Sequence, residues 1–477
     1  MILRRYTALI LGLLLTFSTV GQNLEKDRKA GEEGFEMVKS QMGFYEFEPL
    51  ETLISKVGNK LVAQLDNPLF TYEFYLVDSP EPNAFALPGG KIFVTRGLLA
   101  LPLTEGELAG VIGHEIIHAN NRHGIKQQHG SIFGTIISIP GVIIGGIFRG
   151  PIGTAIASPF LLGNELLQAD YSRGHEREAD KQGTELAAKA GYDPYDLARI
   201  LSRLSSETEL LTGQLEKQSY FASHPFTPKR VKAITKHSEK YVQEKPSPIV
   251  EPALFLKKFD GLMIGQNPEY GFIKEGIFYH PNYHFSIELN CEWQSAITPA
   301  SFSLGSNDGD AILSFVVQED SLNQATYLDE FQKQMLNETG SEPNRKEEFD
   351  WYGYKGGMVE YTSESNGEPV KFQIYAVDYK DGTVFKIAAL FKSVSQKKVE
   401  NLLSNAKVLK ASEIPNTAVP TLQIKKAMQN ETFKSLLDRT GSGEFDLLLK
   451  VINEKSDQHI LNEGELVKII TNKTYKF

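Results

Sequence analysis

The pentapeptide His-Glu-Ile-Ile-His at residues 114–118 constrains this chain more than any other feature. Leucine, valine and isoleucine recur around it at helical spacing and predict a buried helix that begins at Thr104. His114 and His118 are four residues apart, so their imidazoles lie on one face of that helix and can reach the same Zn²⁺. Glu115 is turned away from them by about 100°, so it reaches a metal-bound water more easily than the metal itself.

A second charged helix offers the third ligand. It reads Glu-Arg-Glu-Ala-Asp from Glu176 to Asp180, and these two carboxylates share a helical face. Glu176 can ligate the metal while Asp180 accepts the remaining N–H of a zinc-bound histidine. Glu178 points to another side of the helix and is the competing ligand. With a single cysteine, Cys291, the chain cannot build a cysteine-based metal site, so histidine and carboxylate ligands are required.

The segments around these two motifs predict a mainly helical domain with a small sheet. Residues 71–77 and 91–95 read as strands, and helical patterns precede and follow them. Thr104 and Glu107 have the spacing of a capping box at the start of the first helix. Gly191 has the position of a glycine that ends the second charged helix.

These motifs occur in the order found in a known family. The chain resembles the exported BepA-like branch of the HtpX/CAAX-protease-type zinc metallopeptidases. The resemblance covers about residues 24–243 and rests on four segments: DSPEPNAFALPGG, HEIIH, EREAD followed by KAGYDP, and SHPFTPKR. It implies a gluzincin zinc-peptidase domain at residues 22–245 that holds one Zn²⁺ per chain. Because the family pattern is ExxAD, it also implies Glu176 rather than Glu178 as the third ligand.

The same resemblance implies roles for three further side chains. In the family, the histidine of the Ser-His-Pro segment can lie near or on the zinc and shut the enzyme. His224 is therefore hypothesised to be a regulatory fourth ligand or an oxyanion-side donor. Arg230 would position the substrate carbonyl or this loop. His123 lies past the expected end of the helix, and we expect it to be structural rather than a ligand.

Residues Asn83, Ala84, Phe85 and Ala86 are expected to form an edge strand beside the cleft. An extended substrate can pair with such an edge through main-chain hydrogen bonds, which do not depend on its sequence. The alternative is an ordinary sheet edge that binds no ligand.

The remainder of the chain divides into three parts. Residues 246–280 begin with a proline-rich stretch and are expected to be a linker. Residues 281–411 alternate strands with two helices and predict an α+β domain, which makes the whole chain α+β. Residues 417–477 read strand, helix, helix, strand, a βααβ order that resembles a LysM module and would imply peptidoglycan contact. Because Gln-Asn-Glu-Thr at residues 429–432 replaces the usual Gly-Asp-Thr turn, a structural cap is the alternative.

Two apolar segments bear on location. Residues 1–21 combine two arginines with an apolar run and small residues, which is typical of a signal peptide and predicts an exported, periplasmic protein. Residues 131–148 carry no charge, but glycine and proline interrupt them. They predict either a buried helical hairpin or a flap facing a membrane or partner, which would make the protein peripheral to a membrane. The net charge of −10 argues against a nucleic-acid partner.

We therefore expect an exported zinc-dependent metalloendopeptidase that hydrolyses peptide bonds of unfolded, misfolded or misassembled envelope proteins, a function in protein quality control. Glu115 would take a proton from zinc-bound water and pass it to the leaving amine. The alternative is a periplasmic chaperone or assembly scaffold with latent protease activity. Either protein could act with the outer-membrane assembly machinery.

Overall fold

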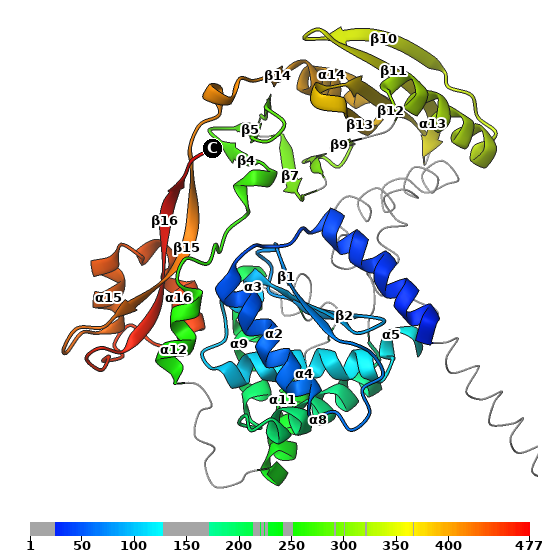
Figure 1. Ribbon diagram of the computed structural model, residues 1–477. Helices are drawn as coiled ribbons and strands as arrows, with labels where there is room; N and C mark the ends of the chain where they lie inside the picture. The colour runs from blue at the N-terminus through cyan, green and yellow to red at the C-terminus, as the bar shows by residue number, and fades with distance from the viewer. Residues whose placement is uncertain are drawn as a thin grey trace, which may run out of the picture.

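The computed structural model describes most of the chain (Figure 1). The predicted signal peptide at residues 1–21 and the uncharged segment at residues 131–148 lie outside the described residues. Within the described part, no helix is both long enough and apolar enough to cross a membrane. The described residues are 24–126, 171–212, 220, 224, 228–241, 251–290, 292–299, 301–319, 322–365 and 367–477.

Residues 24–241, here called the N-terminal domain, combine helices with a three-stranded sheet, as the sequence predicts. Strands β1 (Glu73–Val77), β3 (Lys91–Thr95) and β2 (Ala84–Leu87) follow one another across the sheet in that order. β1 is parallel to β3 and β2 is antiparallel to it, so β2 forms one edge. The helices are residues 24–41, α2 (Glu48–Val62), α3 (Arg96–Leu99), α4 (Glu105–Asn120), α5 (His123–Lys126), α8 (Arg173–Lys189), α9 (Asp196–Thr212), α11 (Pro228–Ser238) and η1 (Glu239–Tyr241).

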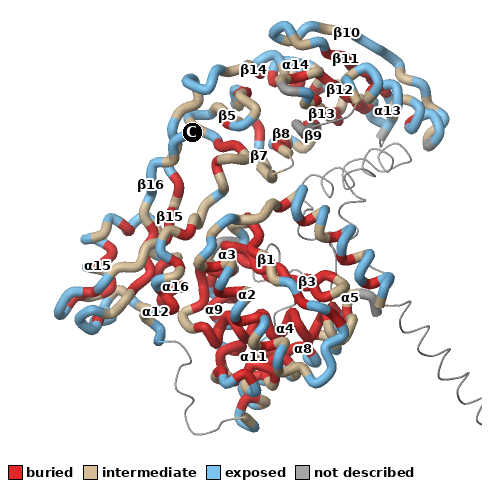
Figure 2. The backbone as a smooth tube through the Cα atoms, in the orientation of Figure 1, coloured by how far each residue is buried: buried red, intermediate tan, exposed pale blue. Residues whose placement is uncertain are grey.

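Helix α4 lies at the centre of this domain, where Figure 2 shows the densest buried backbone. Its residues Glu105–Ala119 are all buried, and it contacts α2, α8 and α9. A Cβ on Gly110 would lie 3.0 Å from Leu197 of α9, and a Cβ on Gly183 of α8 would lie 3.0 Å from the backbone nitrogen of His114. Glycine at these two positions therefore allows α8 and α9 to approach α4 closely.

The capping box predicted for α4 is only half formed. Thr104 Oγ1 accepts a hydrogen bond from the backbone N–H of Glu107 at 3.1 Å, as expected. The Glu107 carboxylate accepts its backbone hydrogen bond from Leu103 at 2.7 Å, and it also accepts from Arg203 of α9 at 2.6 Å. Because a buried guanidinium requires a charged partner, Glu107 connects the start of α4 to α9 as well as capping the helix.

The prediction that residues 246–280 form a linker is wrong for residues 252–280. Phe255 and Phe259 in this segment are completely buried. A proline in the first turn of a helix costs no hydrogen bond, so a proline-rich stretch can lead directly into one. The segment consists of three short helices and two strands: α12 (Pro252–Leu256), η2 (Lys257–Phe259), η3 (Pro268–Tyr270), β4 (Phe272–Lys274) and β5 (Ile277–His280). We call residues 252–270 the strap.

Residues 272–408 form an α+β accessory domain. A seven-stranded antiparallel sheet has the order β10-β11-β12-β13-β9-β8-β7, and a four-stranded sheet has the order β14-β6-β5-β4. Helix α13 packs on one face of the large sheet, while α14 and the small sheet pack on the other. The further elements are β6 (Phe285–Glu288), β7 (Trp293–Ile297), β8 (Phe302–Ser306), β9 (Ala311–Glu319), α13 (Gln324–Thr339), β10 (Arg345–Trp351), β11 (Tyr354–Ser365), β12 (Glu368–Asp378), η4 (Lys380–Gly382), β13 (Thr383–Lys392), η5 (Ser393–Ser395), α14 (Gln396–Ser404) and β14 (Ala406–Val408).

Residues 417–477, the C-terminal module, have the predicted βααβ order. β15 and β16 pair antiparallel along their whole length. The strap adds to the free side of β15, where the backbone N–H of Gly261 donates to Leu422 O and that of Ile264 donates to Pro420 O, both at 2.8 Å. After η6 (Ala411–Glu413), the elements are β15 (Thr417–Lys426), α15 (Phe433–Thr440), η7 (Gly443–Phe445), α16 (Asp446–Asn453) and β16 (Leu466–Tyr475).

Candidate metal centre

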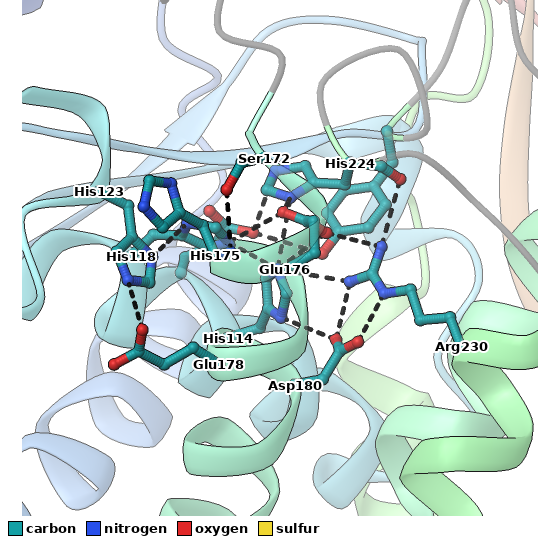
Figure 3. Close-up of polar contacts among 12 residues, drawn as sticks. His114, His118, His123, Ser172, His175, Glu176, Glu178, Asp180, His224 and Arg230 are labelled. Atoms are coloured by element: carbon teal, nitrogen blue, oxygen red, sulfur yellow. Dashed lines mark hydrogen bonds and ion pairs between the residues drawn. The ribbon is translucent and has the colours of Figure 1, made fainter. Parts of the chain in front are cut away.

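Four side chains that the sequence analysis singles out converge in the interior of the N-terminal domain: His114, His118, Glu176 and His224 (Figure 3). All four are buried, and one potential ligand atom from each lies within 4.8 Å of the others. His118 Nε2 is 2.9 Å from His114 Nε2 and 3.2 Å from Glu176 Oε1. Glu176 Oε1 is also 3.0 Å from His224 Nδ1. Ligands of a tetrahedral zinc ion lie about 3.4 Å apart, so these distances resemble those of ligands around one small cation.

The chemistry of this cluster also fits a cation. Three imidazole nitrogens and a carboxylate oxygen face one another in the protein interior. A neutral imidazole carries only one N–H, and burying several imidazolium charges together is costly. A divalent metal ion accepts all four atoms without any proton between them. Nitrogen and oxygen donors of this kind suit zinc as well as other divalent transition metals.

Two helices and one connecting segment position these ligands. α4 presents its two histidines one turn apart, and the close approach at Gly183 brings α8 to their side. α8 begins after Ser172, whose Oγ accepts the backbone N–H of His175 at 3.2 Å, and it carries Glu176 near this first turn. His224 comes from the chain between α9 and α11, and its backbone N–H donates to Tyr220 O at 3.0 Å.

Asp180 and Arg230 lie behind the ligands. Asp180 Oδ1 is 3.1 Å from His114 Nδ1, the ring nitrogen that faces away from the cluster. Arg230 donates to both oxygens of Asp180, at 2.7 and 2.8 Å, and its Nη1 lies 2.8 Å from Glu176 Oε2. Burial alone would raise the pKa of Asp180, but the charge of Arg230 lowers it below its ordinary value. Asp180 is therefore a charged acceptor that can hold His114 in the tautomer needed for metal binding.

Glu115 lies beside the cluster and is completely buried. Its Oε1 accepts a hydrogen bond from the Tyr220 hydroxyl at 3.4 Å and is 3.6 Å from His224 Nε2. Burial raises the pKa of Glu115, and the nearby His224 and His114 oppose this shift. A carboxyl group with a raised pKa accepts a proton more readily at neutral pH, as a general base must.

Glu178 and His123 lie outside the four-residue cluster. The Glu178 side chain is 45% exposed, and its carboxylate is 3.5 Å from His123 Nε2. His123 is nevertheless closer to the centre than the sequence suggests, because its Nδ1 is 3.1 Å from His118 Nδ1. It therefore contacts the ring edge of His118 that faces away from the other ligands. The ring of His175 stacks on His123, with centroids 4.4 Å apart.

Two tyrosines of the site were not recognised from the sequence. The Tyr220 ring stacks on His224 at a centroid distance of 4.3 Å, and the Tyr171 ring lies 3.8 Å from that of His118. Both tyrosines are buried. Tyr220 precedes His224 by four residues, a helical spacing that could have indicated the contact. Nothing in the local sequence distinguishes Tyr171, which directly precedes the cap of α8.

The expected substrate-binding residues Asn83, Ala84, Phe85 and Ala86 lie at the predicted sheet edge. Ala84 to Ala86 belong to β2. The backbone N–H of Asn83 donates to Thr95 Oγ1 at 2.8 Å, and Asn83 O accepts from the backbone N–H of Thr95 at 2.9 Å. The segment approaches the metal centre through Tyr220, whose backbone N–H donates to Pro82 O at 3.0 Å. Among the described strands, β3 is the neighbour of β2 in the sheet order, and no strand follows on its other side.

Comparison with known proteins finds similarity over the part of the chain that contains this site. The model of Peptidase family M48 matches residues 50–238. A beta-barrel assembly-enhancing protease of Yersinia pestis is 29% identical over 206 residues, which are 42% of this chain and 41% of the relative. The mitochondrial metalloendopeptidase OMA1 of Schizosaccharomyces pombe is 29% identical over 219 residues, which are 44% of this chain and 61% of the relative. The chain thus matches less than two thirds of the length of either relative.

Proposed function

Residues 50–238 are a BepA-like domain of peptidase family M48, and from this premise we propose that the chain is a zinc-dependent metalloendopeptidase. The convergence of His114, His118 and Glu176, with Glu115 buried beside them, carries the proposal. When bound by these three residues, zinc supplies a Lewis acid for a peptide carbonyl and acidifies water.

The residues around this site have separate tasks in such a reaction. Glu115 accepts a proton from the attacking water and delivers it to the leaving amine, which its raised pKa supports. Asp180 orients His114 through Nδ1, so that Nε2 faces the cluster. Arg230 balances the charges of Glu176 and Asp180, which would otherwise repel each other in the interior.

His224 supports a second element of the proposal, a closed resting state. A catalytic zinc needs one open position for water or substrate. His224 Nδ1 lies 3.0 Å from Glu176 Oε1 and 3.3 Å from His114 Nε2, within the ligand cluster. We therefore infer that His224 is a fourth ligand that holds the enzyme latent until it moves away.

The substrate and location follow from the relatives' names together with the sequence. Relatives named for beta-barrel assembly support misassembled envelope proteins as substrates and the outer-membrane assembly machinery as a partner. The expected signal peptide at residues 1–21 supports a periplasmic location. A chaperone or scaffold that seldom cleaves is the second candidate, because a closed site could bind clients without hydrolysing them. The LysM-like character of residues 417–477 and its contact with peptidoglycan remain predictions, which binding to insoluble peptidoglycan would test.

Cleavage of casein by the chain and by its Glu115→Gln variant tests the proposal. We expect cleavage by the unchanged chain, loss of at least about 100-fold in rate for Glu115→Gln, and zinc retained by both proteins. Glu46→Gln, which changes an exposed glutamate of the same domain, is the matched control and should cleave normally. If neither the zinc-loaded chain nor its His224→Ala variant cleaves casein, the protease proposal is rejected and the chaperone alternative is favoured.

The variant His224→Ala separates latency from a direct role in the reaction. If His224 closes the site, removing its ring should raise casein cleavage while one zinc per chain remains bound. If it is instead an oxyanion-side donor, the same change should lower the rate. Zinc content, measured on the same samples, excludes simple loss of the metal as the explanation.

A further inference from the structure

A pocket of about 780 Å³ lies between α8 and α11 and reaches the candidate metal centre. The described residues that line it belong to these two helices. The inner wall of the pocket includes Glu176 and Asp180. Ile234 of α11 contributes to the apolar part of the pocket lining. A pocket of this size is large enough to hold several side chains or a short peptide segment. Any ligand in it lies next to the residues that would hold the metal.

The outer wall of this α8–α11 pocket is cationic. Arg173, Arg177 and Lys181 follow one another at intervals of four along α8, so they form a row on one helical face. Lys229 lines the pocket from α11. All four side chains are exposed. Among the described residues, no acidic side chain forms an ion pair with any of them.

The two carboxylates in the pocket wall do not neutralise this row. Glu176 and Asp180 are both paired with Arg230, at 2.8 and 2.7 Å. Glu176 would also contribute its charge to the metal. Within the described part of the chain, the four exposed cations therefore line the pocket without an acidic partner. This is a local property, because the chain as a whole carries a net charge of −10.

We propose that the α8–α11 pocket binds acidic segments of the substrate, and so favours proteins with aspartate or glutamate a few residues from the bond that is cut. This inference rests on the proposed function and names a substrate class for it. A peptide fits better than a lipid surface, because the cations line a concave pocket that ends at the metal centre. Exposed charges of this kind act at long range and are screened by salt.

Two quenched fluorescent peptides test the proposal. They are identical except that one carries aspartate and glutamate where the other carries asparagine and glutamine on one side of the cleaved bond. With the full chain, we expect kcat/KM to be about fivefold to tenfold higher for the acidic peptide, mainly through KM. The preference should shrink as salt is added. The double variant Arg177→Gln/Lys181→Gln should remove it.

Lys232→Gln/Lys236→Gln is the matched control. These lysines lie four residues apart on α11, are exposed, and do not line the pocket. The control should keep the preference for the acidic peptide. If it loses the preference as fully as Arg177→Gln/Lys181→Gln does, general surface charge explains the effect and the pocket does not.

Binding to the Glu115→Gln variant distinguishes this inference from the proposed function. Fluorescence anisotropy of the labelled peptides measures pocket binding without cleavage. Acidic-peptide binding that requires Arg177 and Lys181 supports the pocket even if neither peptide is ever cut, in which case only the protease proposal fails. Equal cleavage of both peptides rejects the pocket and leaves the protease intact. Binding of phosphatidylglycerol vesicles through Arg177 and Lys181, without competition by the acidic peptide, would assign the cations to a membrane instead.

Discussion

The accessory domain and the C-terminal module relate to the N-terminal domain in opposite ways. The apolar clusters of the accessory domain contain only residues between 278 and 408. The apolar residues of the C-terminal module, which is farther along the chain, belong to the same cluster as those of the N-terminal domain and the strap. In Figure 1 the accessory domain extends away, while α16 and α12 lie beside the helices of the N-terminal domain. Separation in sequence therefore does not predict which region is part of the core.

Polar contacts make the junction with the C-terminal module specific. Lys468 of β16 is fully buried, and its Nζ donates to Ala100 O at 2.7 Å and to Pro102 O at 2.6 Å. These carbonyl groups belong to the short connection between α3 and Thr104, the cap of α4. Arg203 joins Glu107 of α4 to Glu454 of the module, with Nη2 distances of 3.0 and 2.7 Å. The module thus holds the start of the helix that carries the two metal-binding histidines.

Deleting each region in turn should show the largest contrast. Removing residues 417–477 uncovers Phe255 and Phe259 and the face of α9 that contacts α16. Burial of one such aromatic side chain is worth roughly 1.5–3 kcal/mol. Uncovering both, together with the α9 face, therefore costs an amount comparable with the stability of a typical domain, about 5–15 kcal/mol. We expect the thermal transition of the N-terminal domain to disappear from circular dichroism and no zinc to be retained.

The matched deletion replaces residues 275–415 with a short glycine–serine linker. The cut ends lie close together, because Lys274 Nζ donates to Asn416 O at 2.9 Å. This protein should keep its zinc and the thermal transition of the N-terminal domain. A chain that folds and binds zinc without residues 417–477, or fails to do so without residues 275–415, would contradict the comparison.

A single core substitution in the accessory domain should destabilise that domain and leave the stability of the N-terminal domain unchanged. Phe385 of β13 is buried, and its ring stacks on Trp351 at 5.5 Å. Phe385→Ala should destabilise this domain by about 3–5 kcal/mol. Both tryptophans of the chain, Trp293 and Trp351, lie in the accessory domain, so tryptophan fluorescence during urea unfolding reports on it selectively.

The control for Phe385→Ala is Phe255→Ala in the strap. Phe255→Ala should not change the urea concentration at which tryptophan fluorescence reports unfolding. It should lower the urea concentration at which zinc is released. If Phe385→Ala also changes zinc release, the two regions unfold as one unit and the comparison is wrong.

Lys468→Met should destabilise the folded chain by a smaller amount, and the size of this effect should depend on pH. The change leaves the carbonyl groups of Ala100 and Pro102 without their donor, at a cost of about 1–3 kcal/mol. Burial lowers the pKa of Lys468 well below its ordinary value. Between that lowered pKa and the unfolded value of about 10.4, the unfolded chain binds a proton that the folded chain does not. Stability should therefore rise with pH in this window for the unchanged chain and not for Lys468→Met.

Zinc release during urea unfolding at pH 7 and pH 9 measures this difference. Glu454→Gln is the control, because its partly exposed side chain leaves the Arg203–Glu107 pair intact. It should change stability by less than about 1 kcal/mol and keep the pH dependence. Equal stability of Lys468→Met and the unchanged chain at both pH values would show that the amine does not anchor the junction.

Local pattern was sufficient for most elements of secondary structure. Helical spacing identified α4 and α8, and the strands with two helices predicted within residues 281–411 agree with the observed accessory domain. The two motifs also identified His114, His118 and Glu176 as candidate ligands, because positions four apart on a helix must share a face. The family resemblance was needed to choose Glu176 over Glu178 and to add His224. The strap was wrongly predicted to be part of a linker, since proline at a helix start and proline in a linker have the same local sequence.

The sequence by itself therefore determined which side chains could meet a metal and which faces of each element had to be buried. Only the tertiary structure decided what covers those faces. It placed Tyr171 against His118, Arg230 between Glu176 and Asp180, and the C-terminal module against α9. The physical reason is that apolar burial is non-directional: a hydrophobic stripe requires a partner but does not specify one. Long-range packing and buried charge pairs such as Arg203 with Glu107 make that choice.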